Sequence, residues 1–282
     1  MIERLAIVGL GLLGGSLAKA ARTRGLAREI VAIGRRRESV APALADGTVN
    51  RIDLDVASGV AGADVVVLAT PVTTLVEQLP AVWAAAADGA LVTDVGSTKG
   101  RIVAVAEQLG ARRPLAFVGS HPMAGSHLGG YGVSHVDLFQ GARVVLTPTE
   151  RTLPEATRRA RALWEAVGGQ VTVLDPATHD RAVAAISHLP HLVADALVDA
   201  VLRMDPAFLD VAARGFKDTT RIAASVPTVW TEIFQDNRVA LGETLAAFRK
   251  SLDHLEALIG AGDSAALQRE LARIRDAREA LG

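Results

Sequence analysis

The chain has 282 residues, half of them apolar, and its 30 Lys and Arg residues oppose 31 Asp and Glu residues for a net charge of -1. This length allows one large domain or two modest domains, each with its own hydrophobic core. The balanced charge and the aromatic content of only 4% argue against nucleic acid and membrane surfaces as partners. The absence of cysteine excludes disulfides, thiolate nucleophiles and cysteine-ligated metal centres.

The amino-terminal sequence gives no sign of a targeting segment. Its first residues run directly into a short apolar stretch that ends at glycines, without the basic and long apolar regions of a signal peptide. No apolar run looks long enough to span a membrane. We therefore expect a cytoplasmic protein.

The first part of the chain alternates short β-branched runs with stretches rich in Ala and Leu. Strands are expected at residues 5–8, 30–33, 65–69, 91–94, 117–119, 144–147 and 171–174. Continuous apolar strands separated by helices indicate a doubly wound α/β domain of the Rossmann type, with a parallel sheet covered on both faces. After Asp175 and Pro176 the pattern is helical to the end. The sequence predicts a nucleotide-binding domain over residues 1–175 and an all-α domain over residues 176–282.

A glycine-rich turn follows the first expected strand and opens a helix. Gly9, Gly11 and Gly14 occupy the three positions of a dinucleotide fingerprint, where glycine allows a tight turn, close approach of a pyrophosphate, and helix-to-strand packing. The free N–H groups of the helix that starts at Leu12 and Leu13 favour phosphate. A purely structural turn is the alternative. We also assign Thr70 and Pro71 to the nucleotide site, because they follow a later strand directly.

The end of the second expected strand favours NADP over NAD. A site specific for NAD usually carries an acid here, whereas this chain has Gly34 followed by three arginines. Guanidinium groups bind a 2′-phosphate by charge-assisted hydrogen bonds, so we assign Arg35 and Arg36 to the cofactor. A solvated basic turn is the alternative.

Two segments after later strands carry candidate chemistry. Residues 94–99 contain Ser97, and residues 120–126 place His121 in what looks like a loop just past a strand, at the sheet edge where ligands bind. Imidazole has a near-neutral pKa, so His121 is a candidate proton acceptor beside a nicotinamide, with activity rising with pH near about 6.5. Ser97 could hydrogen-bond to it. A histidine with only a structural role is the alternative.

The helical half adds two further pairs of polar side chains. His188 and His191 lie three residues apart, but no carboxylate at a supporting spacing accompanies them, so we predict no metal site. Lys217 and Arg221 lie four residues apart and could clamp a carboxylate from one helix face. A solvated basic face would have the same spacing.

A one-sided apolar seam occupies the last long helical stretch. Its members recur at spacings of four and three: Leu241, Leu245, Phe248, Leu252, Leu255 and Ile259. Packing on the chain's own domain and packing in a homodimer both fit this pattern.

Taken in order, these segments resemble the prephenate/arogenate dehydrogenase family of tyrosine biosynthesis. The resemblance covers nearly the whole chain and is carried by residues 9–16, 94–99, 121–125, 187–191 and 215–222 and by Trp230. It implies a nucleotide-binding domain, a helical dimerisation domain and an active site in the cleft between them. Its expected reaction is the NAD(P)-dependent oxidative decarboxylation of prephenate to 4-hydroxyphenylpyruvate, or of arogenate to tyrosine.

The resemblance also implies roles for particular residues. His121 matches the catalytic histidine, Ser97 the serine beside it, and Arg221 the arginine that binds the substrate carboxylate. The remaining substrate-pocket residues it implies are His188, His191, Lys217, Asp218 and Trp230. Two departures bear on specificity: His127 stands where many members that use prephenate have an acid, and Gly34 replaces the acid of NAD-specific members.

Two other functions remain open at this point. Another NADP-dependent dehydrogenase, such as one acting on 3-hydroxy acids, would account for the glycines and the helices. A non-catalytic module that senses nucleotides and signals through a dimer would do so as well.

Overall fold

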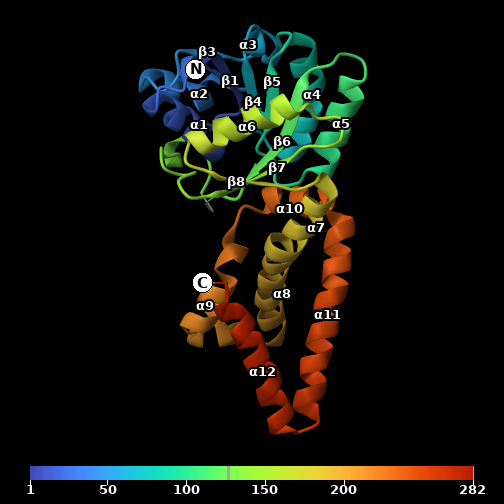
Figure 1. The fold of residues 1–282 in the computed structure, drawn as a ribbon. Helices are drawn as coiled ribbons and strands as arrows, with labels where there is room; N and C mark the ends of the chain where they lie inside the picture. Colours follow the sequence, from blue (N-terminus) through green and yellow to red (C-terminus); the bar gives the residue numbers. More distant parts are fainter. Residues whose placement is uncertain (126–127, 282) are drawn as a thin grey trace.

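The computed structural model describes residues 1–125 and 128–281 and shows a sheet domain followed by a helical domain (Figure 1). The sheet has the order β3-β2-β1-β4-β5-β6-β7-β8. Its strands are β1 Ile2–Val8, β2 Ala27–Ile33, β3 Arg51–Asp53, β4 Val65–Leu68, β5 Leu91–Asp94, β6 Ala116–Pro122, β7 Arg143–Thr147 and β8 Gln170–Val173.

Helices cover both faces of this sheet. They are α1 Leu12–Thr23, α2 Arg37–Ala45, α3 Val56–Val60, α4 Val72–Ala85, α5 Gly100–Gly110 and α6 Pro154–Ala166. Alternate residues of β1 enter separate cores: Leu5 and Ile7 join the cluster that contains Trp164 of α6, while Ala6 joins the cluster that contains Leu79 of α4. A strand buried on both faces must be apolar at every position, which explains the continuous runs in the sequence.

The expected Rossmann-type architecture is confirmed, with two differences. The strand β3 was not expected, because it has only three residues and two of them, Arg51 and Asp53, are charged. In addition, β7 pairs antiparallel with β6, whereas the other pairs are parallel.

The antiparallel pair changes the setting of His121. The recorded pairing of β5 with β6 ends at Thr93 and Val118, but β7 supports β6 further, with His121 opposite Val145. The expectation that His121 lies in a loop is therefore wrong. It lies inside β6, because the ladder with β7 carries the strand beyond the end of β5.

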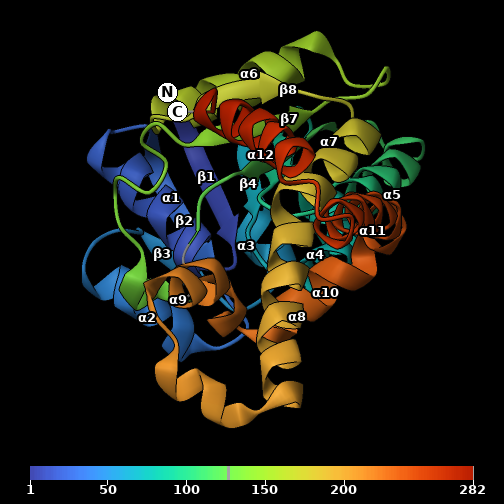
Figure 2. The same cartoon turned by 90° about the horizontal axis from the view of Figure 1, so that it is seen from below.

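The helical domain begins directly after β8. Its helices are α7 Pro176–Val183, α8 Leu189–Met204, α9 Arg214–Thr220, α10 Pro227–Asp236, α11 Arg238–Gly260 and α12 Ser264–Glu279, with a π-helical turn at Ala184–His188. The Asp175 side chain caps α7 by accepting from the Thr178 N–H at 2.9 Å, and Pro176 occupies the first turn. Figures 1 and 2 show these helices gathered on one side of the sheet, with α11 and α12 forming a long hairpin.

One helical stretch, Pro176–Met204, is by length and composition long and apolar enough to cross a membrane. The expectation that no run reaches that length is thus wrong for this stretch, whose mean hydropathy is 1.3. The same stretch contacts the sheet domain through Asp180, whose carboxylate accepts from two backbone N–H groups of the α5 amino terminus. These contacts lead us to interpret it as an interdomain helix.

The apolar seam of α11 is only partly covered by the chain itself. Leu241 is buried, whereas Leu252 is 52% exposed and Ile259 is 65% exposed. The alternative in which this helix packs only on its own domain therefore does not account for the outer half of the seam.

Candidate active site between the two domains

A cavity of about 780 Å³ lies at the carboxyl ends of β1, β2 and β4. Predicted cofactor residues on its wall are Gly9, Gly11, Arg35, Thr70 and Pro71, together with Gly34. Sequence reasoning did not assign Gln78 or the loop around Tyr131, which also line it. Neither carries a motif that would have singled it out.

The backbone of this cavity fits a dinucleotide. Gly9 has a φ of 94°, and a Cβ on Gly14 would lie 2.0 Å from the Gly9 carbonyl oxygen, so both positions require glycine. A Cβ on Gly11 would meet nothing within 4 Å, which leaves open space at the start of α1. Gly11 is also the N-cap of α1 and makes no side-chain cap, so the first N–H groups remain available to a phosphate.

The other predicted cofactor residues lie less directly on the cavity. Leu12 and Leu13 form the first turn of α1 and are half-buried. Arg36 is exposed at the N-cap of α2 and does not line the cavity, whereas Glu38 does. Only one of the two assigned arginines is therefore brought to the site.

A second cavity, of about 470 Å³, lies between the two domains. Its wall brings together Ser97 and His121 of the first domain with His191, Arg221 and Trp230 of the second. Gly129 lines this cavity and Gly130 lines the first one, so one loop borders both. The sequence had placed all five side chains at one site although they lie up to 133 positions apart in the chain.

Three predicted substrate residues do not reach this cavity. Lys217 and Asp218 are exposed on α9, where Asp218 lies 3.6 Å from Arg214. Arg221 follows the end of α9 and begins a 3₁₀ turn. His188 is buried away from the cavity, with its Nδ1 atom 3.2 Å from the Asn237 amide. His127 lies outside the described residues.

His121 is held in a nearly dry environment. Its side chain is 8% exposed, and its Nδ1 atom lies 2.9 Å from Nε2 of His179. Burial first, then the neighbouring His179, Lys99 and His188, lowers the pKa of His121 well below 6.5. The expectation that activity rises near pH 6.5 is therefore corrected toward lower pH, and His121 is neutral at neutral pH. Among the described residues its hydrogen-bond partner is His179, while Ser97 shares the cavity wall.

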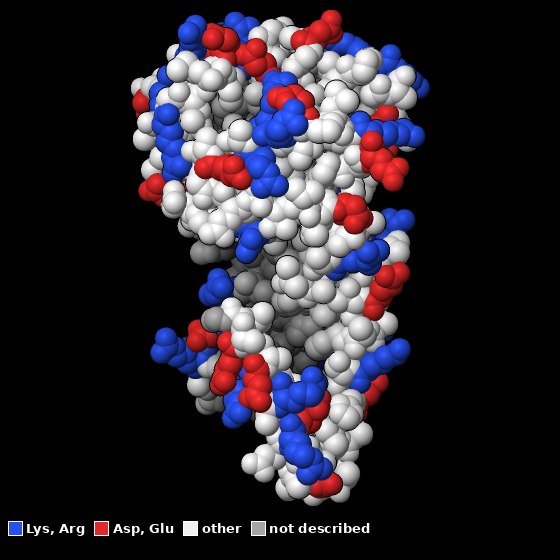
Figure 3. Space-filling model, in the orientation of Figure 1, with Lys and Arg blue, Asp and Glu red and all other residues white. Residues whose placement is uncertain are grey.

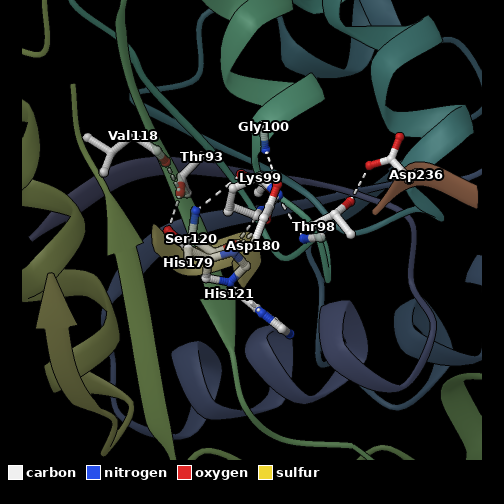
Figure 4. A network of polar contacts seen from close by, with 12 residues as sticks. Thr93, Thr98, Lys99, Gly100, Val118, Ser120, His121, His179, Asp180 and Asp236 are labelled. Atoms are coloured by element: carbon white, nitrogen blue, oxygen red, sulfur yellow. Dashed lines mark hydrogen bonds and ion pairs between the residues drawn. The ribbon is translucent and has the colours of Figure 1, made fainter. Parts of the chain in front are cut away.

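His179 and Asp180 were not assigned from the sequence. His179 Nδ1 lies 2.8 Å from Asp180 Oδ1, and the Asp180 oxygens accept from the backbone N–H groups of Lys99 and Gly100, each at 2.8 Å (Figure 4). Although burial opposes it, these hydrogen bonds lower the pKa of Asp180, so its carboxylate is charged. The adjacency of a histidine and an aspartate was visible in the sequence, but nothing there placed the pair beside His121.

A buried ion pair between Lys99 and Asp94 contacts strand β6 next to His121. The Lys99 ammonium contacts the Asp94 carboxylate and donates to the Ser120 carbonyl at 2.8 Å, and both charged side chains are fully buried. Burial lowers the pKa of Lys99 even though Asp94 opposes this. Because Ser120 precedes His121, these contacts fix the backbone that carries the imidazole.

The opposite wall of the cavity is aromatic. The rings of His191 and Trp230 are stacked 3.5 Å apart at an angle of 16°, and Phe234 lies against both. The buried Nδ1 atom of His191 has no hydrogen-bond partner among the described residues. This wall can therefore accept a flat, six-membered ring.

Within the described part of the chain, no group of three or more His, Asp or Glu side chains is arranged to hold a metal ion. The polar groups His121 and Arg221, which line the cavity, can hold and move protons and bind an anion.

Comparison with known proteins agrees with this geometry. The model of the prephenate dehydrogenase nucleotide-binding domain matches residues 17–173, and that of the prephenate dehydrogenase dimerization domain matches residues 175–273. The chain belongs to the prephenate dehydrogenase family. It is therefore an oxidoreductase that uses a nicotinamide cofactor.

Relatives of this family member match over the whole chain. A prephenate dehydrogenase of Lactococcus lactis is 33% identical and aligns with 99% of this chain and 78% of its own. The structure of prephenate dehydrogenase from A. aeolicus, in complex with hydroxyphenyl propionate and NAD+, has 34% identity and a TM-score of 0.93, with 100% and 99% coverage. That of Synechocystis arogenate dehydrogenase has 33% identity and a TM-score of 0.87, with 99% and 100% coverage.

Proposed function

We propose that this enzyme catalyses the oxidative decarboxylation of prephenate to 4-hydroxyphenylpyruvate. The observation that carries the proposal is a neutral, buried histidine, His121, on the wall of a cavity that also receives Arg221 and adjoins the nucleotide cavity. Hydride transfer from a ring carbinol needs a base, an anchor for the substrate anion and a neighbouring nicotinamide. The two cavities supply the first two and have room for the third.

The proposed chemistry follows from the substrate. Prephenate carries a hydroxyl group and, across its ring, a carboxylate. His121 takes the hydroxyl proton while hydride leaves the same carbon, and loss of CO2 returns the electrons of the broken C–C bond to the ring, which becomes aromatic. The phenolate oxygen formed in this way then takes a proton to give the phenol of the product. The bound nicotinamide supplies the hydride acceptor.

The side chains around this reaction act mainly by positioning. Arg221 anchors a carboxylate of the substrate, and the stacked His191 and Trp230 hold the ring. Ser97 lies on the His121 side and is placed to contact the hydroxyl group. Orientation of this kind contributes roughly 7–11 kcal/mol to a reaction, and a general base about 10²–10⁴-fold.

Arogenate is the second candidate substrate. It differs from prephenate by an amino group in place of the side-chain keto group, and an arogenate dehydrogenase is as similar to this chain as the prephenate enzyme is. An assay that crosses both substrates with NAD and NADP, followed at the nicotinamide absorbance, decides both specificities. We expect the highest kcat/KM for prephenate with NADP. Absence of turnover with either substrate would refute the proposed function.

A preference for NADP is supported by the end of β2. Gly34 leaves no carboxylate to repel a 2′-phosphate, and the Arg35 guanidinium lies on the cavity wall. Glu38 shares this wall and opposes the preference, so we expect NADP to be favoured without NAD being excluded.

A homodimer formed through the helical domain is also part of this proposal, with the domain boundary at residues 175 and 176 and a cytoplasmic location. The exposed side chains of Leu252 and Ile259 on α11 and Leu271 on α12 support it. Apolar side chains exposed along a helix are typical of a surface that is buried against another protein chain. The changes Leu252→Glu and Ile259→Glu together should convert a dimer to a monomer in light scattering after gel filtration. An unchanged mass would contradict this interface.

A further inference from the structure

A chain of three side chains runs from the active-site cavity to the amino terminus of α5. His121 lines the cavity, His179 lies behind it, and Asp180 lies behind His179, with separations of 2.9 Å and 2.8 Å between the bonded atoms (Figure 4). His121 belongs to β6 of the sheet domain, whereas the other two belong to α7 of the helical domain. The side chain of His179 is fully buried, so the middle of this chain is shielded from water.

The order of charges along this chain fixes the positions of the protons. A carboxylate can only accept, so His179 must donate to Asp180 from Nδ1. With that one proton on its ring, His179 has a lone pair on Nε2, which can only accept, so His121 donates to it from Nδ1–H. The remaining nitrogen of neutral His121, Nε2, is consequently unprotonated and is the ring nitrogen not bonded to His179, and His121 lines the cavity.

The Asp180 carboxylate is itself held in place. Its two oxygens accept separately from the backbone N–H groups of Lys99 and Gly100, at the positive end of the α5 dipole. The Asp180 carbonyl accepts from the Asn237 amide at 2.8 Å. The charged end of the chain thus cannot rotate without breaking contacts between the two domains.

We propose that His179 and Asp180 are positioning residues that hold His121 in the tautomer required of the base, with Nε2 unprotonated toward the substrate. The catalytic importance of this tautomer rests on the proposed function. The assignment of the tautomer itself does not depend on the proposed function. Since His121 belongs to the sheet domain and His179 to the helical domain, the base is set in its active form only when the helical domain is docked on the sheet.

The groups that face this chain also favour a neutral resting state. The neighbouring His179, Lys99 and His188 disfavour a charge on His121, and Asp180 is the negative group, separated from His121 by His179. When His121 takes a proton, its Nδ1–H bond to His179 strengthens, and His179 in turn polarises toward the carboxylate. The chain therefore stabilises the imidazolium that forms during the reaction.

The tautomer is tested directly by ¹⁵N NMR of the histidine side chains in the full-length protein. At neutral pH we expect His121 to show a protonated Nδ1 and an unprotonated Nε2. In His179→Leu the Nδ1 partner is gone, so the His121 tautomers should become mixed. Finding His121 with Nε2 protonated in the unaltered protein would overturn the proposal, whatever substrate the enzyme uses.

Steady-state kinetics give the second measurement. His179→Leu should lower kcat by about 10- to 100-fold, less than the full contribution of a general base, with little change in the KM values. His179→Gln should recover much of the loss, because its amide oxygen can accept from His121 Nδ1–H. Val183→Ala, at another buried position of α7, controls for packing and should keep kcat.

The outcomes separate the two claims. If the unaltered enzyme turns over neither prephenate nor arogenate, the proposed function fails while the NMR result still decides the tautomer. If His179→Leu folds and binds NADPH but keeps its kcat, the positioning role is wrong. If Gln is as damaging as Leu while Val183→Ala is active, acceptance of the His121 proton is not what His179 provides.

Discussion

The two domains of this protein bury their apolar residues in different ways. In the sheet domain, β1 and β4 are buried along residues 5–8 and 65–68, and helices cover both faces. In the helical domain, α11 has a single buried residue, Leu241, and α12 has none among its described residues. The first domain therefore completes its core within one chain, whereas the second presents apolar surface that a second copy can cover.

The same contrast divides the active site. His121, on the sheet side, is 8% exposed and held by a hydrogen bond, whereas Arg221, on the helical side, is exposed. The proposed proton acceptor is thus held by the fold of one chain, while the side chain proposed to bind the substrate anion is exposed. Charged side chains elsewhere are mixed in sign over the face drawn in Figure 3, so attraction of the substrate depends on these local groups.

Among these changes, removal of the proposed base His121 should lower activity the most. A small effect would contradict the contrast drawn between the two sides of the active site. In His121→Asn we expect kcat to fall by about 10²–10⁴-fold, because His121 is the only imidazole or carboxylate among the described sheet-domain residues that line this cavity. NADPH binding, measured by fluorescence titration, should persist, since His121 lies on the other cavity. Near-normal turnover would rule out His121 as the base.

His188 is a buried residue of the helical domain, and its burial should make the free energy of unfolding depend on pH. Burial lowers the pKa of His188 to about 4, against the opposing charge of Asp180 and with smaller contributions from His179 and His191. Between that value and about 6.5 the unfolded chain binds more protons than the folded one, so acid destabilises the fold. From pH 7 to 4 the His188 contribution should cost about 3 kcal/mol of unfolding free energy. Urea titrations should show a shallower pH dependence in His188→Gln, and identical slopes would contradict this.

The exposed side chain of Arg221, on the helical side of the cavity, should contribute to substrate binding. Arg221→Ala should raise the KM for prephenate by about 10- to 100-fold, as expected for loss of a charge-assisted hydrogen bond worth about 1.5–3 kcal/mol. The KM for NADP should change little. Arg203→Ala removes an exposed arginine of α8 that pairs with Asp199 and serves as the matched control. An equal effect of both changes would show that only net charge matters.

The smallest effect concerns the cofactor. Arg35→Ala should raise the KM for NADP by about 10-fold relative to that for NAD, because a single charge-assisted contact to the 2′-phosphate is lost. Arg36→Ala should have a smaller effect, since that side chain does not line the cavity. Parallel changes in both KM values would show that Arg35 does not read the 2′-phosphate.

Local patterns in the sequence were sufficient for most of the fold. Strands buried on both faces are apolar at every position and were located within a few residues, whereas β3 was missed because an edge strand of three residues needs no such pattern. The setting of His121 was misjudged because the extension of β6 depends on its pairing with β7, which is distant in the chain.

By itself, the sequence determined the glycine turn, the change from α/β to helical structure, and which polar segments gather at the cleft, because each is encoded by neighbouring residues and by strand order. Only the tertiary structure decided that His179 and Asp180 lie behind His121, that Lys217 and Arg36 stay outside the cavities, and that burial lowers the pKa of His121. Those properties depend on the distance between atoms and on exclusion of water, and both arise only when the domains pack.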